Sequence, residues 1–268
     1  MALKIGVMAE SFRAENFRKA VETASSLGAT GMQAYITDKS PLLTIDDMTD
    51  EKVREVLDIM KSHGLIFSAI CGDMDYGFED KEQNPHYIDR SKRILDIAKK
   101  LECSIVTTHI HEVPIEENER KQTMRDACNE LASYADSIGS CFALETGPEP
   151  GKRLAEFLGT LDAKGVRVNF DPANLIMDAG DDPVEAVDYL KDYIVHTHAK
   201  DGRKLGATTY IELPLGTGDV DFDKYLPKLA SVGFDGYLTI EREVGENPYA
   251  DIKLAFDFLT EKKKVLGV

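Results

Sequence analysis

The sequence contains no apolar run that could cross a membrane. A spanning helix needs about 18 or more consecutive apolar residues, and no stretch of the chain approaches that length. Residues 1–5 continue directly into a strand pattern, without the charged leader and apolar segment of a signal peptide. We therefore expect a cytoplasmic protein with no membrane partner.

Cysteine is scarce, and its spacing points to no chemistry. The four cysteines lack a C-x-x-C pair, and three of them fall in apolar, strand-like runs. This pattern is typical of buried thiols in a reducing compartment rather than of a zinc site or a disulfide framework.

Basic residues are outnumbered by acidic ones. The 32 lysines and arginines against 48 aspartates and glutamates give a formal net charge of −16, which disfavours nucleic acid as a partner. Linkers and low-complexity tracts are missing as well. The length of 268 residues suits one α/β barrel, for which about 250 residues is typical, so we expect a single domain over residues 1–268.

What the chain does contain is a repeated alternation of strand-like and helix-like segments. Strand-like runs recur at residues 3–9, 31–36, 65–71, 104–109, 141–145, 166–171, 193–198 and 236–241. Helical segments follow them at residues 14–27, 50–63, 85–101, 116–138, 154–161, from 183 onward, 222–231 and 249–264. A long loop rich in Gly and Thr is expected up to Gly218.

Eight strand and helix repeats predict an α/β protein with a (β/α)8 TIM-barrel fold. A doubly wound open sheet is the alternative, but it explains eight units less well. The first strand is also not followed by the Gly-rich phosphate loop of that fold. In a barrel, the active site lies at the C-terminal ends of the strands, so these ends are where catalytic groups are expected.

Four predicted strands end on groups that bind metal ions: Glu145, Asp171, His198 and Glu241. The two-residue period of each strand points all four side chains into the barrel. Three carboxylates and one imidazole form an oxygen-rich set suited to Mn²⁺, Mg²⁺, Co²⁺ or a similar ion. Taken singly, each residue fits a solvated acid or a core histidine equally well. Four of them at one barrel mouth favour a metal site.

The two glutamates come from nearly opposite strands and suggest a reaction. A bound metal would hold two adjacent oxygens of a sugar and stabilise an enediolate. Glu145 or Glu241 would take a proton from carbon, and the other would return one on the opposite face. This is the chemistry of an isomerase or epimerase.

Further polar residues lie at or near the same strand ends. His109 has inward parity and is expected to reach a substrate oxygen or the catalytic centre. His196 is expected one layer deeper, in a supporting role. Asn174 fits either a hydrogen bond near the metal or a turn cap. Lys200 is a candidate for charge near a substrate carbonyl or phosphate, or is solvated, and Glu212 is a candidate lid or substrate residue.

These residues fall in motifs that resemble the xylose isomerase-like TIM-barrel superfamily, which includes sugar phosphate isomerases/epimerases, inosose-processing enzymes and AP endonuclease family 2-like (type IV) endonucleases. The motifs occur in the family's order: Thr107-Thr-His109, Leu144-Glu-Thr-Gly-Pro-Glu149, Asn169-Phe-Asp-Pro-Ala-Asn174, His196-Thr-His-Ala-Lys-Asp201, Leu215-Gly-Thr-Gly-Asp-Val-Asp-Phe222 and Asp235-Gly-Tyr-Leu-Thr-Ile-Glu241. The resemblance covers essentially the whole chain.

The resemblance implies that Glu145, Asp171, His198 and Glu241 bind one divalent metal ion. Mn²⁺ is the first expectation, with Mg²⁺, Co²⁺ or Zn²⁺ as alternatives. It also implies that Glu145 and Glu241 form the acid–base pair of the epimerase branch. The ketose 3-epimerases usually have His where this chain has Asn174 and Arg where it has Lys204. The endonucleases bind three zinc ions through additional His and Asp ligands, where this chain offers Tyr210 and Glu212.

Three functions remain open from the sequence. The first is a metal-dependent isomerase or epimerase acting on a small-molecule carbohydrate: a sugar, sugar phosphate, keto-sugar or cyclitol. The second is a metal-dependent lyase or dehydratase acting on an inosose or a 3-keto-glycoside by the same proton abstraction. The third is a non-catalytic sugar-binding barrel, against which the paired glutamates argue. Barrels of this kind often pair, and the sequence leaves a homo-oligomer open.

Overall fold

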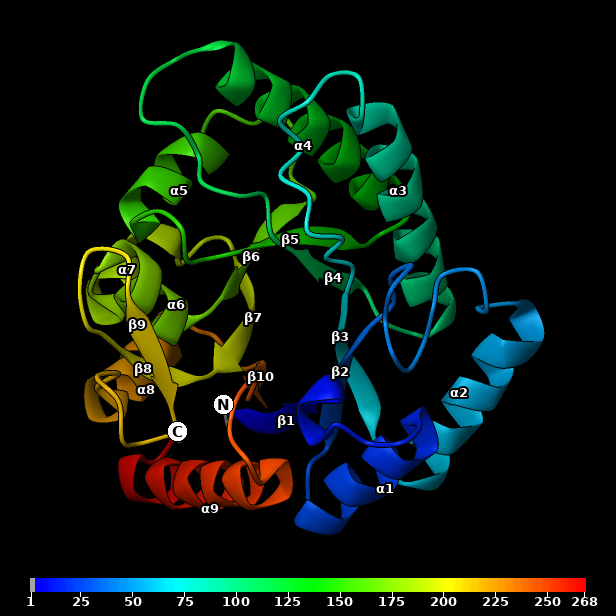
Figure 1. The fold of residues 1–268 in the computed structure, drawn as a ribbon, viewed down its shortest axis with the longest axis vertical. Helices are drawn as coiled ribbons and strands as arrows, with labels where there is room; N and C mark the ends of the chain where they lie inside the picture. Colours follow the sequence, from blue (N-terminus) through cyan, green and yellow to red (C-terminus); the bar gives the residue numbers. More distant parts are fainter. Residues whose placement is uncertain (1–2) are drawn as a thin grey trace.

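The computed structural model describes residues 3–268, and eight of their strands form a closed parallel barrel (Figure 1). Around the barrel the order is β1-β10-β7-β6-β5-β4-β3-β2, with β2 returning to β1. The strands are β1 (Lys4–Met8), β2 (Gly31–Tyr35), β3 (Ile66–Cys71), β4 (Ile105–Thr108), β5 (Cys141–Glu145), β6 (Val166–Phe170), β7 (Ile194–Ala199) and β10 (Tyr237–Ile240). The predicted TIM barrel is confirmed.

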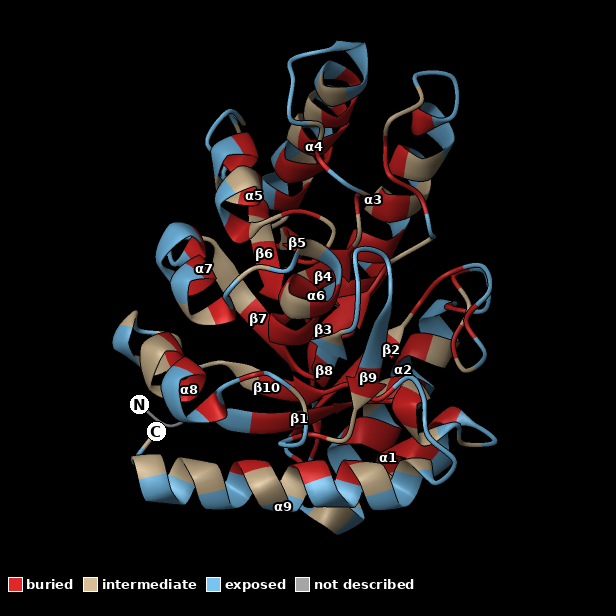
Figure 2. Ribbon diagram, turned by 60° about the vertical axis from the view of Figure 1, so that its left-hand side comes forward, coloured by how far each residue is buried: buried red, intermediate tan, exposed pale blue. Residues whose placement is uncertain are grey.

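Helices surround the barrel, each with one face buried against the strands (Figure 2). They are α1 (Phe17–Leu27), α2 (Asp50–Ser62), α3 (Asn84–Lys100), α4 (Glu119–Ser137), α5 (Gly151–Leu158), α7 (Pro183–Leu190), α8 (Phe222–Ser231) and α9 (Pro248–Leu266). Residues 154–161 were expected to form the helix that the structure begins at Gly151. The helix starts early because the Gly151 backbone N–H donates to the Asp181 carboxylate at 2.8 Å. None of the helices in residues 3–268 is long and apolar enough to span a membrane.

The stretch expected as a loop before Gly218 contains a hairpin, which corrects that prediction. Strands β8 (Asp201–Lys204) and β9 (Tyr210–Leu213) pair antiparallel outside the barrel. The Asp201 carboxylate accepts hydrogen bonds from the backbone N–H groups of Gly216, Gly218 and Val220. This long-range contact holds the segment after β9 against β8. Asp201 is buried, and its carboxylate anchors the segment that follows the hairpin.

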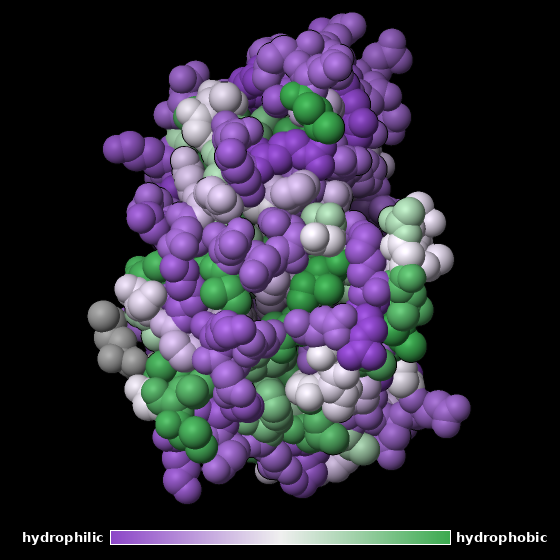
Figure 3. All heavy atoms as spheres, turned by 90° about the vertical axis from the view of Figure 1, so that its left-hand side faces the viewer, coloured by the Kyte–Doolittle hydropathy of each residue, from purple (hydrophilic) through white to green (hydrophobic). Residues whose placement is uncertain are grey.

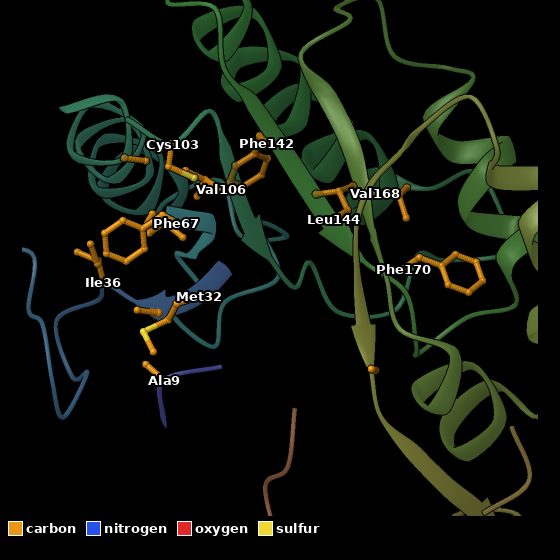
Figure 4. Packing of buried hydrophobic residues seen from close by; sticks show 14 of the residues in the cluster. Ala9, Met32, Ile36, Phe67, Cys103, Val106, Phe142, Leu144, Val168 and Phe170 are labelled. Carbon is orange, nitrogen blue, oxygen red and sulfur yellow. The ribbon is translucent and has the colours of Figure 1, made fainter. Parts of the chain in front are cut away.

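The strands separate an apolar outer layer from a polar interior. Val168 and Phe170 point outward, as predicted, and the Phe170 ring stacks on Tyr225 of α8 with centroids 5.6 Å apart. Figure 4 shows part of this outer layer, including Phe142 and Leu144 of β5. Hydrophilic side chains cover most of the molecular face shown in Figure 3, in keeping with the high charge of the chain.

Three short elements lie at the C-terminal mouth of the barrel. A 3-10 turn, η1 (Glu10–Phe12), follows β1, and α6 (Pro172–Asn174) follows β6. The chain then continues through η2 (Leu175–Ala179), a π-helical segment closed by Gly180 in the left-handed region. These turns bring side chains back over the strand ends, where the candidate site lies.

Candidate metal centre and active site

The four strand-end residues predicted from the sequence converge in the structure. Glu145 ends β5, His198 lies near the end of β7, and Asp171 and Glu241 directly follow β6 and β10. One ligand atom from each lies within 4.8 Å of all the others. Each of the four residues is buried, so the cluster is shielded from solvent.

His198 points one ring nitrogen at the three carboxylates. Its Nδ1 lies 3.4 Å from Glu145, 3.3 Å from Asp171 and 3.2 Å from Glu241. Its Nε2 lies 2.9 Å from the Oε1 atom of Gln33. An acceptor at Nε2 places the ring proton there in the neutral imidazole and leaves the Nδ1 lone pair facing the carboxylates.

Gln33 is a site residue that sequence reasoning missed. It is fully buried on β2, and its amide nitrogen donates to Thr107 Oγ1 at 2.9 Å. This bond fixes the amide so that its oxygen faces His198. A single glutamine inside a short strand carries no sequence signal of such a role, because its partners come from β4 and β7.

Two carboxylates of the cluster, those of Glu145 and Glu241, are held ionised by the basic groups around them. Burial alone would raise the pKa of Glu145, but His198 and His109 hold it well below its usual range. Burial likewise opposes ionisation of Glu241, whereas His198 and Lys200 lower its pKa to about 2. Burial disfavours the charged form of His198, yet Glu241 and Glu145 raise its pKa well above its usual range. The cluster therefore attracts positive charge.

Asp171 is oriented by the helical turn that follows it. Its Oδ1 accepts the backbone N–H groups of Ala173 and Asn174 at 2.8 and 2.9 Å, which caps α6. The other oxygen, Oδ2, is thereby left facing His198.

Both oxygens of Glu145 receive amide hydrogen bonds. Asn174 Nδ2 donates to Oε1 at 2.9 Å, so this predicted residue directly contacts one of the four candidate metal ligands. Asn169 Nδ2 donates to Oε2 at 2.8 Å, and its own oxygen lies 2.8 Å from His196 Nδ1. His196 thus sits one layer below the cluster and orients Asn169. Asn169 shares the inward parity of Asp171, which is the signal that would have identified it.

His109 links the cluster to the loop after β3. Its Nε2 lies 3.4 Å from Glu145 Oε1, and its Nδ1 lies 2.7 Å from Asp73 Oδ2. The structure therefore brings this predicted residue to the site. Asp73, which sequence reasoning did not single out, orients the ring.

The two remaining candidates differ in position. Lys200 Nζ lies 3.0 Å from Glu241 and 2.5 Å from Glu243, so it reaches the cluster. Glu212 lies on β9, and its carboxylate is bound by the Arg242 guanidinium at 2.6 Å. Its oxygens also accept the Glu243 backbone N–H. The structure thus gives Glu212 an ion pair that fastens the hairpin to the loop after β10.

Comparisons with known proteins agree with this fold. Residues 21–262 match the model of a family described as xylose isomerase-like TIM barrel. The chain is 26% identical over 125 residues to an uncharacterized protein of Methanocaldococcus jannaschii. That match spans 43% of this chain and 41% of the relative's length.

Three solved structures match over almost the whole chain. A xylose isomerase domain protein from Planctomyces limnophilus is 25% identical, with a TM-score of 0.86 and coverage of 99% of this chain and 98% of that one. The 3-keto-D-glucoside 4-epimerase of E. coli is 18% identical, with a TM-score of 0.77 and coverage of 97% and 99%. A xylose isomerase-like TIM barrel protein from Mycobacterium smegmatis, in complex with magnesium, is 16% identical, with a TM-score of 0.77 and coverage of 98% of each chain. The last two similarities concern the fold alone.

Proposed function

Because this chain belongs to the family of xylose isomerase-like TIM barrels, we propose that it is a divalent-metal-dependent sugar isomerase or epimerase. The observation that carries the proposal is the buried set of Glu145, Asp171, His198 and Glu241, in which two glutamates from different strands flank one imidazole. A small carbohydrate is the expected substrate. The four unpaired cysteines support a cytoplasmic location.

The donor set fits a hard divalent cation. Three carboxylates and a histidine nitrogen supply mostly oxygen ligands, which suits Mn²⁺ or Mg²⁺ better than a thiophilic ion. The magnesium in the Mycobacterium smegmatis structure supports this assignment. We propose Mn²⁺ as the resident ion. When bound, such an ion would polarise the carbonyl and hydroxyl oxygens of a sugar.

The protein's own groups would move the protons. Glu145 and Glu241 are held ionised in the free protein. Once one of them has taken up a proton from solvent, the other would accept a proton from the carbon beside the carbonyl, and the protonated one would return its proton on the opposite face. Asn169 and Asn174 hold Glu145 in place through both of its oxygens. Lys200 holds Glu241 through one oxygen, Oε2. His109, fixed by Asp73, is placed to hydrogen-bond a substrate oxygen.

Deuterium exchange tests the proposal. The Mn²⁺-loaded protein would be incubated in D₂O with ketoses, keto-sugars and inososes, and deuterium incorporation would be measured by mass spectrometry. We expect exchange beside the carbonyl together with a new epimer or isomer. E145Q and E241Q should each lower the rate by about 100-fold or more. E156Q, on the exposed face of α5, is the matched control.

Two outcomes would change the assignment. Near-normal exchange by E145Q or E241Q would exclude the two-glutamate mechanism. Exchange accompanied by loss of water or an aglycone would make the enzyme a lyase. Metal titration of each variant would separate the loss of a ligand from the loss of an acid–base group.

A further inference from the structure

A cavity of about 540 Å³ opens at the C-terminal ends of β1, β2 and β3. Its size is in the usual range for a small-molecule site. Glu10 and Tyr35 line it, and both also line a smaller cavity of about 230 Å³ that Glu241 borders. Asp73, on the same wall, contacts His109, which reaches Glu145. The wall residues therefore connect this cavity to both proposed acid–base glutamates.

Glu10 is a partly buried wall residue with one oxygen that lacks a hydrogen-bond partner in residues 3–268. Its Oε1 accepts the Tyr35 backbone N–H at 3.1 Å, whereas its Oε2 is buried and has no hydrogen-bond partner within residues 3–268. Burial raises the pKa of Glu10 to about 7, and the largest opposing influences are backbone N–H groups rather than a basic side chain. A buried carboxyl oxygen without a partner is unfavourable, and a ligand hydroxyl would supply the missing hydrogen bond.

The charged groups on this wall are mostly acidic. Asp38, Asp73 and Asp75 join Glu10 among the lining residues. Lys39, at the exposed rim, is the single lysine or arginine among the lining residues that the structure describes. Arg90 pairs with Asp38 and His109 contacts Asp73, whereas Glu10 and Asp75 have no basic partner within residues 3–268. A phosphate group entering the cavity would therefore meet more unpaired negative than positive charge.

The basic side chains elsewhere at the mouth are already engaged. Carboxylates hold Lys200 and Arg242, the first through Glu241 and Glu243. Backbone carbonyl oxygens hold Arg13 and the Lys204 ammonium. To bind a phosphate, any of these groups would first have to give up its present partners.

We propose that this cavity binds an uncharged, polyhydroxylated part of the substrate, and that Glu10 is a hydroxyl-binding residue that disfavours sugar phosphates. The inference rests on the proposed isomerase or epimerase function and narrows its substrate to a free sugar, keto-sugar or cyclitol. Pro41, Met74 and Tyr87 supply apolar surface for the C–H faces of such a ligand. The acidic groups accept its hydroxyls and repel a phosphate.

Binding of matched pairs tests the substrate class without turnover. D-fructose and D-fructose 6-phosphate, D-xylulose and D-xylulose 5-phosphate, and myo-inositol and its monophosphate would be titrated into Mg²⁺-loaded protein by calorimetry. In the pair that binds best, the uncharged member should bind at least about tenfold more tightly. Tighter binding of the phosphorylated member, or no binding of any uncharged member at millimolar concentrations, would overturn the proposal.

Variants test the role of Glu10. E10Q should weaken binding of the preferred uncharged sugar by about tenfold, because the amide places a donor where Oε2 was an acceptor. E149Q is the matched control. Burial raises the pKa of Glu149 to about 7, as it does for Glu10, but Glu149 does not line the cavity. Unchanged affinity in E10Q, with unchanged thermal unfolding, would remove Glu10 from the site.

Two further variants test the role of individual charges at the cavity. D75N, at a position with φ of 55° that asparagine tolerates, should reduce the preference for the uncharged member by a few-fold. K39A should leave binding of uncharged sugars unchanged; a loss confined to phosphorylated members that bind tightly would place a phosphate at Lys39 and contradict the proposal. The binding measurements and the deuterium-exchange measurements are independent. The preference for uncharged sugars can prove wrong while E145Q and E241Q still abolish exchange, and it can prove right when they do not.

Discussion

The two sides of the barrel mouth are built differently. On the side of β5, β6, β7 and β10, the donor groups are buried and each is held by neighbours: Glu145 by two asparagine amides and Asp171 by a helical turn. On the side of β1, β2 and β3 lies an open cavity, and one oxygen of its Glu10 has no hydrogen-bond partner in the part of the chain that the structure describes. The first side is organised before any ligand arrives, and the second leaves hydrogen-bonding capacity for one. We infer that the first determines the reaction and the second the substrate.

Removing His198 should have the largest effect. A metal ion whose free concentration is 100 times its Kd stabilises the folded protein by about 2.7 kcal/mol. In H198A the shift in thermal unfolding caused by Mn²⁺ should disappear, because the nitrogen that faces all three carboxylates is lost. Calorimetric titration should show affinity lowered by about 100-fold or more.

The matched control for this variant comes from the opposite side of the mouth. His86 lines the cavity and is not one of the four candidate metal ligands. H86A should therefore keep the full Mn²⁺-dependent shift. If H198A also kept the Mn²⁺-dependent shift, the ion would bind elsewhere. The assignment of metal binding to one side of the mouth and substrate binding to the other would then be wrong.

Gln33 is where the two sides meet, and its replacement has the next largest effect. It stands on β2, on the cavity side, but its oxygen orients His198. Q33L removes that acceptor at similar volume and should lower Mn²⁺ affinity by about 10-fold to 100-fold. T107V removes only the hydroxyl that accepts from Gln33 and should have a smaller effect. Metal affinity in Q33L equal to that of the unchanged protein would show that His198 needs no such partner.

The sequence predicted the two sides unequally. Glu145, Asp171, His198 and Glu241 end strands, and the two-residue period together with the barrel topology suffices to bring them together. The role of Gln33 depends on which strands become neighbours across the barrel. The significance of Glu10 lies in a missing hydrogen bond, which only the assembled structure reveals. The hairpin of β8 and β9 escaped prediction because the Asp201 carboxylate holds it through backbone groups of the segment after β9, contacts that the sequence pattern does not show.

The smallest expected effect comes from replacing Glu149, which lies on the first side of the mouth and resembles Glu10 on the other side. The pKa of Glu149, like that of Glu10, is raised by burial from 4.5 to about 7, but a Glu149 oxygen accepts the Val113 backbone N–H at 3.1 Å. A carboxyl with a raised pKa in the folded state favours folding at low pH, and that contribution is lost as the pH rises through about 7. E149Q keeps an acceptor for Val113 and removes the buried charge. It should therefore stabilise the protein at pH 8 by about 1–3 kcal/mol and have little effect at pH 5. Chemical denaturation at both pH values measures this difference. A gain of equal size at both values would mean that Glu149 is neutral throughout this pH range and that its ionisation does not oppose folding.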